Sequence, residues 1–432
     1  MAEIVPFQAL RYDPHQLKLE DVVTQPYDKI TPEMQNRYYD LSPHNLVRII
    51  LGRRFETDAP GFNVYTRAAE YLHDWRAGGI LKQDPEPSIY FYSQAFTIPG
   101  SRNLAERRGF IALGRIHDYA DKVVFRHEQT HTKPRADRLE LLRHTRAHFG
   151  QLFMLYNDPE AEIERLLETD EEPDIAVLDE YEVLHRVWRI PDPGTIQKIQ
   201  QRMCEKNLLI ADGHHRYETA LAYRDECRAR AATAGPNASS EFAMMTFIRM
   251  ESPGLVILPT HRIVHGLPNF ESDRLLENAG HFFDVRRIDQ RTESRSATTI
   301  LEEAGQDGTA FVAVMRQGAH LMRAKKRAMQ DALSSLSERQ RNLDVVQLHR
   351  VMLERVMGIS EEAIRNQENV KYERDAAEAI SSVRQGANVA FLMNPARMDQ
   401  VRDIAFSGEV LPQKTTDFYP KLLSGLTIYA LE

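Results

Sequence analysis

The spacing of apolar residues in the first half of the chain alternates between helical and strand-like periods. Apolar side chains recur on one stripe over residues 64–77, which predicts a helix that ends at Gly78 and Gly79. Residues 89–98 are rich in β-forming side chains and lead into a Pro-Gly turn, so we expect a strand whose partner follows over 108–116. Across the first half, the patterns predict helices over 64–77, 137–149, 159–168 and 217–230, and strands over 46–51, 89–98, 108–116, 181–190 and 208–210.

The last part of the chain contains more helical than strand-like runs. Its patterns predict strands over 310–315 and 388–393, and helices over 326–357 and 373–385. No internal repeat is present. The mixture indicates a mixed α/β (α+β) fold with two lobes, residues 1–270 and residues 271–432. We expect the second, helix-rich lobe to close a site that the first lobe carries.

The composition is that of an ordinary globular protein, with 42% hydrophobic and 27% charged residues over 432 positions. The formal net charge of −8 gives the chain as a whole no electrostatic footprint for duplex nucleic acid, so no nucleic-acid partner is expected, although a local basic patch remains an alternative. Cys204 and Cys227 fit no zinc-ligand spacing and are expected to be reduced thiols. The first residues lack a signal-peptide pattern, and no apolar run approaches the ~18 residues of a membrane span. We therefore expect a soluble, cytoplasmic protein without a membrane partner.

The sharpest local motif is Asp212-Gly213-His214-His215-Arg216, between a short apolar strand and a helix. The start of a helix presents backbone N–H groups and positive potential, and such places hold phosphate groups well. Gly213 permits close approach of the backbone, and the guanidinium of Arg216 can contact a phosphate with two N–H groups. His214 and His215 can donate protons, and Asp212 can act as a base or as a ligand for Mg²⁺. The alternative is an ordinary turn with solvated polar side chains.

A second motif, His127-Glu128-Gln129-Thr130-His131, fits the H-E-x-x-H pattern of zinc peptidases. In those enzymes both histidines lie on one helix, but Pro134 disfavours helix at the residue before it. No apolar helical run precedes the motif either. The better interpretation is a polar loop, although zinc remains an alternative.

This loop runs into the helix that Asp137 is expected to cap. Lys133, Arg135 and Arg138 give it positive charge, and Glu128 is a candidate base. The alternative is a solvated loop with no chemical role.

Two weaker clusters contain further candidates. His261 and Arg262 follow an apolar run, an arrangement common where strand ends line a cleft. Lys414 belongs to a basic, hydroxyl-rich loop over 412–421, and residues 25–28 (Gln-Pro-Tyr-Asp) form a turn that could edge a pocket. Each of these alone is more often structural.

Together, five stretches resemble the bacterial and archaeal family catalogued as DUF1015, along essentially the whole chain. They are residues 25–28, 127–138, 211–220, 259–262 and 412–416. The 212–216 motif alone also resembles the D-G-x-H-R box of the ParB/sulfiredoxin-like superfamily. That superfamily includes free-serine kinases, CTP-hydrolysing partition proteins and ATP-using sulfiredoxins, and the box there binds nucleotide phosphates.

These resemblances imply a phosphotransfer enzyme of serine metabolism, either a serine kinase or a phosphoserine phosphatase, with Mg²⁺ and ATP or ADP as cofactors. Phosphoryl transfer needs positioning and charge neutralisation, and no P-loop pattern is present to supply them. Two alternatives remain, a ParB-like nucleotide-binding regulator and a zinc-dependent hydrolase. The expected catalytic residues are Asp212, His214 and Glu128, and the expected phosphate-binding residues are Gly213, His215, Arg216, Lys133, Arg138, His261, Arg262 and Lys414.

Overall fold

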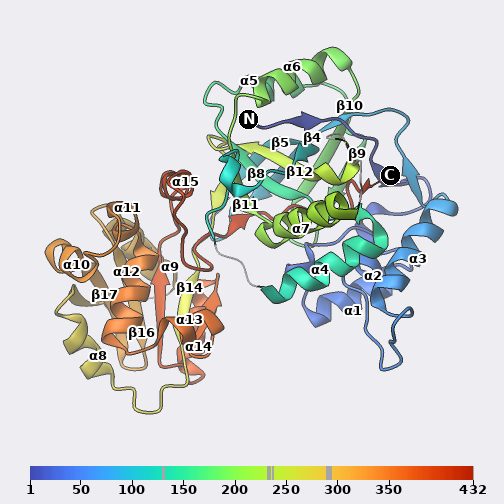
Figure 1. The fold of residues 1–432 in the computed structure, drawn as a ribbon. Helices are drawn as coiled ribbons and strands as arrows, with labels where there is room; N and C mark the ends of the chain where they lie inside the picture. Colours follow the sequence, from blue (N-terminus) through green and yellow to red (C-terminus); the bar gives the residue numbers. More distant parts are fainter. Residues whose placement is uncertain (129–131, 231–234, 236–237, 289–293, 432) are drawn as a thin grey trace. The chain divides into compact units, whose positions relative to one another are not determined.

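The computed structural model of the chain describes residues 1–128, 132–230, 235, 238–288 and 294–431, and for residues 132–135, 294 and 295 it describes the backbone alone. The chain divides into two compact units (Figure 1). Unit 1 consists of Met1–Arg126, Thr130–Val256 and Pro420–Glu432, and unit 2 consists of His127–Gln129 and Ile257–Tyr419. The main division thus follows Val256 rather than falling near residue 270, and the last segment returns to unit 1.

A large mixed β-sheet forms the centre of unit 1 in the described part of the chain. Its order is β6-β11-β8-β12-β5-β4-β10-β9, with β1 paired to β5. Strands β6 and β11 are parallel, as are β8 and β12, while the other neighbours are antiparallel. The strands are β1 (Ile4–Val5), β4 (Ile89–Thr97), β5 (Leu104–Arg115), β6 (Val124–Phe125), β8 (Leu152–Tyr156), β9 (Ile175–Leu178), β10 (Leu184–Ile190), β11 (Leu208–Asp212) and β12 (Phe242–Arg249).

Helices lie on both sides of this sheet, with α5 and α6 on one side and α4 and α7 on the other (Figure 1). Two short strand pairs add to the unit, β2 (Leu10–Tyr12) with β3 (Leu81–Gln83), and β7 (Ala147–His148) with β21 (Tyr429–Ala430). The helices of unit 1 are α1 (Pro32–Leu41), α2 (Val47–Ile50), α3 (Val64–Ala77), α4 (Thr132–Thr145), α5 (Glu162–Leu167), α6 (Pro193–Met203) and α7 (His214–Arg230).

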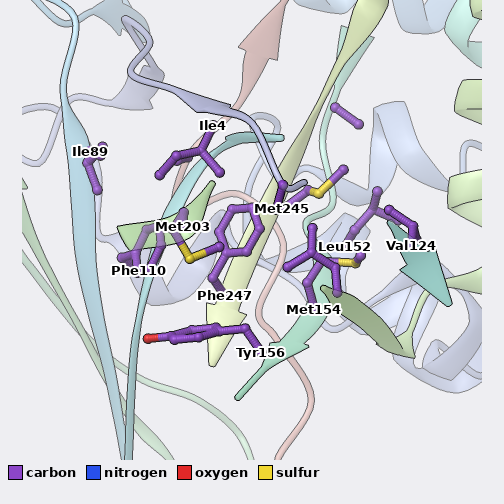
Figure 2. Close-up of a cluster of buried hydrophobic side chains, with 14 of the residues drawn as sticks. Ile4, Ile89, Phe110, Val124, Leu152, Met154, Tyr156, Met203, Met245 and Phe247 are labelled. Carbon is purple, nitrogen blue, oxygen red and sulfur yellow. The ribbon is translucent and has the colours of Figure 1, made fainter. Parts of the chain in front are cut away.

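The main hydrophobic core of unit 1 uses alternate residues of the sheet. Met154 and Tyr156 of β8 and Met245 and Phe247 of β12 point to the same side and are buried (Figure 2). Because side chains alternate along a strand, these positions share the face on which α5 and α6 pack. A second cluster joins α2, α3 and α4 to β2 and β3.

Unit 2 contains an antiparallel sheet in the order β15-β17-β16-β19-β14-β18 within its described residues. Helices α9 and α14 cover one face through Leu301, Val383 and the sheet residues Val312 and Leu392. The strands are β14 (His261–Val264), β15 (Phe283–Ile288), β16 (Ala310–Met315), β17 (Gly318–Ala324), β18 (Val370–Glu373), β19 (Val389–Met393) and β20 (Phe418–Tyr419), with β13 (Val256–Ile257) at the division. The helices are α8 (Ser272–Ala279), α9 (Ser294–Gly305), α10 (Lys326–Ala332), α11 (Glu338–Arg341), α12 (Asp344–Gln347), a π-helix (Leu348–Val356), α13 (Glu361–Asn366), α14 (Ala376–Arg384) and α15 (Met398–Phe406).

The mixed α/β fold and several predicted elements are confirmed. Helix α3 covers the predicted residues 64–77, where Asn63 caps it with a reciprocal Thr66 contact. Strands β4 and β5 pair as expected, and β11 and β16 lie where the apolar runs placed them. Among the described residues, no helix combines the length and the apolar character required to cross a lipid bilayer.

The strand predicted over residues 46–51 is wrong, because this segment forms the short helix α2. Its residues Val47, Ile49 and Ile50 are all buried, and a short, continuously apolar run does not distinguish a buried helix from a buried strand. The Asn45 side chain accepts the Val47 N–H (2.9 Å), which satisfies a free donor at the start of the helix.

The single helix predicted over residues 326–357 is also wrong. The chain breaks into α10, α11, α12 and a π-helix. The Ser337 side chain caps α11 by accepting the Gln340 N–H (3.2 Å), so a new helix begins there.

Other helix boundaries shift by a few residues. Helix α4 begins at Thr132, so Asp137 lies inside it and does not cap it. Pro134 falls in the first helical turn, where the missing N–H costs nothing. The helix ends before Arg146, whose φ is 47°. Helix α14 begins after Asp375, whose side chain accepts two backbone N–H groups.

We predict that Gly109→Ala destabilises unit 1. Gly109 lies in β5, and a Cβ atom there would come 2.2 Å from the Phe247 carbonyl oxygen of the neighbouring strand. Moving a central strand of a packed sheet should lower the free energy of unfolding by about 1–3 kcal/mol, measured by urea denaturation. The control is Gly194→Ala, where the nearest atom would lie at 3.4 Å. Equal stabilities of the two variants would contradict the prediction.

Candidate functional site

The predicted phosphate motif lies at the junction of β11 and α7 in unit 1. Strand β11 is buried up to Ala211, and α7 begins at His214, three residues earlier than predicted. Gly213 between them has a φ of +98°, a conformation that favours glycine. A Cβ there would also lie 3.1 Å from Nε and Nη2 of Arg216 and from Leu152. Glycine is therefore needed for both the turn and the close approach of Arg216.

Two cations share the carboxylate of Asp212. Arg216 Nη2 donates to Oδ2 at 2.8 Å, and Lys421 Nζ lies 3.3 Å from Oδ1. Burial alone would raise the pKa of Asp212, but the charges of Lys421, Arg216 and Lys29 outweigh it and hold that pKa well below its ordinary value. Asp212 is therefore ionised at neutral pH and surrounded by positive charge.

Arg216 also borders a cavity of about 90 Å³ in unit 1. Its Nη1 donates to the Gln151 carbonyl, which fixes the guanidinium between the cavity and Asp212. Most of the wall is apolar, from Leu141 and Leu142 of α4 and Ala220 of α7 among others. Such a cavity suits the uncharged part of a small ligand.

The same cavity brings together two residues from separate predicted motifs. Arg138 of α4 and Tyr27 of the 25–28 turn both line it, and the guanidinium carbon lies 4.2 Å from the Tyr27 ring centroid. Arg138 is held by Asp137 Oδ2 (2.9 Å from Nε) and by the Ile50 carbonyl. Burial and the charge of Asp28 raise the pKa of Tyr27, so its hydroxyl stays protonated at neutral pH.

Buried polar side chains hold the segment that carries Lys421. Arg107 donates to Gln94 Oε1 (Nε, 3.0 Å) and to the Pro420 carbonyl (Nη2, 2.5 Å), and Gln94 Nε2 donates to the Lys421 carbonyl (2.9 Å). The Arg107 guanidinium also lies 4.6 Å from the Phe153 ring centroid. Burial lowers the pKa of Arg107 to about 10, which still leaves it charged at neutral pH.

A parallel network holds the segment that carries Tyr27 and Lys29. Gln25 Nε2 donates to Asp179 Oδ2 (2.9 Å), which lies 3.2 Å from His185 Nε2. Tyr92 Oη lies 2.7 Å from His185 Nδ1. Burial lowers the pKa of His185, so a single proton remains, and it belongs on Nε2 because Asp179 can only accept. Both networks are buried and link distant segments to the surroundings of Asp212.

The remaining residues of the motif have simpler surroundings. His214 is buried and His215 is partly exposed, and both belong to the first turn of α7. The Thr219 hydroxyl donates to the His215 carbonyl at 2.8 Å. The side chain of Lys133, like that of Arg135, lies outside the described part of the structure. The roles predicted for these residues stay predictions.

Glu128 and Lys414 meet within unit 2. The Lys414 N–H donates to Glu128 Oε1 (3.2 Å), and His127 Nε2 lies 2.7 Å from Thr416 Oγ1. The Leu411 N–H donates to the His127 carbonyl at 2.7 Å. Of the predicted polar loop, residues 127 and 128 thus contact the 411–416 loop, whereas residues 132–138 are part of α4. The catalytic role of Glu128 stays a prediction.

His261 and Arg262 also belong to unit 2, in β14. Arg262 is fully buried and donates to the carbonyls of Thr260 and Lys414, the latter at 3.0 Å. His261 Nδ1 accepts the Met393 N–H at 3.1 Å. Burial, with the charge of Arg262, lowers the pKa of His261 to about 4, so it is uncharged at neutral pH. These contacts stabilise unit 2, and a phosphate-binding role for either residue stays a prediction.

The zinc alternative finds little support in the geometry. His127 and Glu128 precede α4 and do not lie on a helix, while His131 is outside the described residues. Within the ranges that the structure describes, no three His, Cys, Asp or Glu side chains gather into a group that could hold a metal ion.

Lys421, Lys29 and Tyr27 were not predicted as site residues. Lys421 ends the basic loop noted in the sequence, but it is 209 positions from Asp212, and local spacing cannot reveal such a contact. Tyr27 belongs to the 25–28 turn and Lys29 follows it. The sequence predicted for this turn only a place at the edge of a pocket.

We predict that acid destabilises unit 1 partly through His148, which lines the cavity. Burial lowers its pKa to about 4, whereas an unfolded histidine titrates near 6.5. The unfolded state therefore binds more protons between these values, and the free energy of unfolding falls as pH drops from about 6.5 towards 4. Between pH 7.5 and about 5.5, the free energy of unfolding of His148→Phe, measured by urea denaturation, should fall by about 1 kcal/mol less than that of the wild type. The exposed His281→Gln is the control, and parallel curves for all three proteins would contradict the prediction.

Comparisons with known proteins give the family of the chain. No curated protein matches it. Similar solved structures include a free serine kinase in complex with AMP, 14% identical over 71% of this chain and 89% of that chain, with a TM-score of 0.33. A conserved hypothetical protein from Pyrococcus furiosus is 13% identical over 71% and 93% of the two chains (TM-score 0.34), and SbnI with a C-terminal truncation from Staphylococcus aureus is 10% identical over 73% and 87% (TM-score 0.36). These scores are too low to support an inference about activity. The sequence profile of the family described as "Protein of unknown function (DUF1015)" matches residues 4–346, and the chain belongs to this family.

Proposed function

We propose that the β11–α7 junction binds the phosphate group of a substrate and that the protein is a phosphotransfer enzyme acting on serine or O-phosphoserine. The observation that carries the phosphate site is the sharing of the Asp212 carboxylate by Arg216 and Lys421. The choice of serine rests on the resemblance of the 212–216 motif to the superfamily that includes free-serine kinases.

The charge balance around Asp212 favours an anion. Arg216, Lys421 and Lys29 all lower the pKa of this one carboxylate, so three cations act on a single ionised group. A phosphate dianion would restore the balance and could accept charge-assisted hydrogen bonds from Arg216 and Lys421. The first turn of α7, with Gly213, His214 and His215, would add backbone N–H groups and the positive end of the helix dipole.

The neighbouring cavity would receive the rest of the ligand. It shares Arg216 with the proposed phosphate site, and its other polar lining residues are Tyr27, Arg138, His148, Thr219 and Ser424. A nucleotide or an amino acid phosphate both combine a charged group with a less polar part, and ATP or ADP is the proposed phosphate donor or product in the kinase direction.

Asp212 changes its role between the empty and the occupied site. With both oxygens in contact with cations it is a weak base, and it positions Arg216 and Lys421. When a phosphate takes up those cations, the pKa of Asp212 rises, and the carboxylate becomes able to accept the proton of an attacking hydroxyl. In the kinase direction the serine oxygen forms a bond to phosphorus, the bond from phosphorus to the nucleotide oxygen breaks, and the hydroxyl proton moves to the carboxylate.

The remaining residues take supporting roles in the proposal. Mg²⁺ would neutralise phosphate charge, and Asp212 is the carboxylate that could contact it. With water as the acceptor the reaction is that of a phosphatase, and His214 would protonate the leaving oxygen. Glu128 remains the second candidate base, with His261, Arg262, Lys133 and Lys414 as further candidates for phosphate contacts.

The test is phosphate transfer and release by the full-length protein with Mg²⁺, followed by ³¹P NMR. One arm contains O-phosphoserine alone, and the other contains serine with ATP or ADP. We expect turnover in one arm, with Arg216→Gln and Lys421→Met each reducing the rate about 100-fold or more, because each removes a cation that neutralises the transferring group.

Two surface variants of α6, Arg202→Gln and Lys198→Met, are the matched controls and should keep wild-type rates. Turnover that is insensitive to Arg216→Gln would remove the site from the reaction. Silence in both arms would contradict the serine assignment. Nucleotide binding without turnover would favour the regulator instead.

A further inference from the structure

Unit 1 contains a second polar cavity, of about 260 Å³, among its N-terminal helices. Residues of α1, α2 and α3 form it together with the loop that follows α2. It shares no lining residue with the cavity beside Arg216. None of its residues belongs to a motif that the proposed function uses.

Three arginines and three aromatic residues dominate the wall of this cavity. The guanidinium carbons of Arg48 and Arg53 lie 4.3 and 4.2 Å from the ring centroid of Tyr39. The guanidinium carbon of Arg67 lies 4.7 Å from the ring centroid of Phe55. Tyr71 completes the aromatic part. Stacking against rings holds a guanidinium in place while leaving its edge N–H groups for a ligand.

The positive charges of the cavity are only partly compensated. Arg67 forms an ion pair with Asp58, with 2.6 Å between Nη1 and Oδ1. Across the described ranges of the chain, neither Arg48 nor Arg53 has a carboxylate oxygen within 4.0 Å. Asp40 also lines the cavity, but its carboxylate forms no ion pair with Arg48 or Arg53.

Uncharged groups position both of these guanidiniums. Arg48 Nη2 donates to the Tyr39 carbonyl (2.9 Å), and Arg53 Nη2 donates to Asn36 Oδ1 (2.9 Å). The Arg53 backbone is fixed as well, because its N–H donates to the Tyr39 hydroxyl at 2.9 Å. A guanidinium has five N–H donors, so both side chains keep donors for a ligand and lose little freedom when it binds.

We propose that this cavity binds the phosphate group of a small phosphorylated molecule, with Arg48 and Arg53 as the groups that contact the phosphate. Two guanidiniums without carboxylate partners match the double negative charge of a phosphate monoester better than the single charge of a carboxylate. The volume exceeds that of a phosphate ion, and the aromatic walls suit an organic part. The site is independent of the β11–α7 junction.

Isothermal titration calorimetry with phenyl phosphate tests this proposal on the full-length Arg216→Gln variant, in which the proposed phosphate site at the β11–α7 junction lacks its guanidinium. We expect one binding event. Introducing Arg48→Gln and Arg53→Gln together into this variant should weaken the affinity for phenyl phosphate at least tenfold. Adding Arg53→Lys instead keeps the charge and should give intermediate affinity. Adding Arg274→Gln, an exposed arginine of α8, should change nothing.

Several outcomes would overturn the proposal. The first is no binding of phenyl phosphate at millimolar concentration. The second is an affinity that Arg48→Gln and Arg53→Gln leave unchanged while circular dichroism shows the variant folded. The third is tighter binding of benzoate than of phenyl phosphate, which would make the ligand a carboxylate. The phosphotransfer assay does not involve Arg48 or Arg53. A negative calorimetry result would therefore not affect the proposed function, and a negative phosphotransfer result would not affect the proposal for this cavity.

Discussion

The ionised carboxylate of Asp212, held between Arg216 and Lys421, is the constraint on which the candidate site depends. Arg216 comes from the same short motif, whereas Lys421 comes from the last segment of the chain. The two cations lower the pKa of the carboxylate against the effect of burial, and the carboxylate in turn compensates their charges in this partly buried place. The pair of contacts therefore fixes the start of α7 and the C-terminal segment together, and it concentrates positive charge where a helix begins.

The buried polar networks of unit 1 support this arrangement. Arg107 and Gln94 donate to the carbonyls of residues 420 and 421, respectively. Asp179 accepts from the Gln25 side chain and is itself held by His185. A buried charge or amide is costly unless it is fully hydrogen-bonded, so such networks restrict each segment to one position. They act on the candidate site indirectly, because they hold the backbone from which Lys421, Tyr27 and Lys29 extend. The site is thus built on positions that the core of the unit fixes.

Local chemistry made part of this site predictable from the sequence. A glycine between an apolar strand and a helical run predicted the turn between β11 and α7, which the structure confirms, while the phosphate chemistry of the motif stays a prediction. Lys421 could not be found in this way, since its contact with Asp212 depends on the return of the chain after unit 2. The strand predicted over residues 46–51 is a helix in the structure, because a short segment whose apolar residues are nearly all buried lacks the periodicity that distinguishes a helix from a strand. His261 has the polar character of a site residue, yet the Met393 N–H occupies its Nδ1.

The most direct test of this account is a measurement of the pKa of Asp212. The titration is monitored by the ¹³C chemical shift of the Asp212 carboxyl group, and that signal is assigned by its absence in Asp212→Asn. We expect a pKa well below the ordinary value of an aspartate in the free protein, a rise on addition of inorganic phosphate, and a rise in Lys421→Met without phosphate. An ordinary pKa that responds neither to phosphate nor to the loss of Lys421 would contradict the claim that these cations gather on Asp212 to receive an anion.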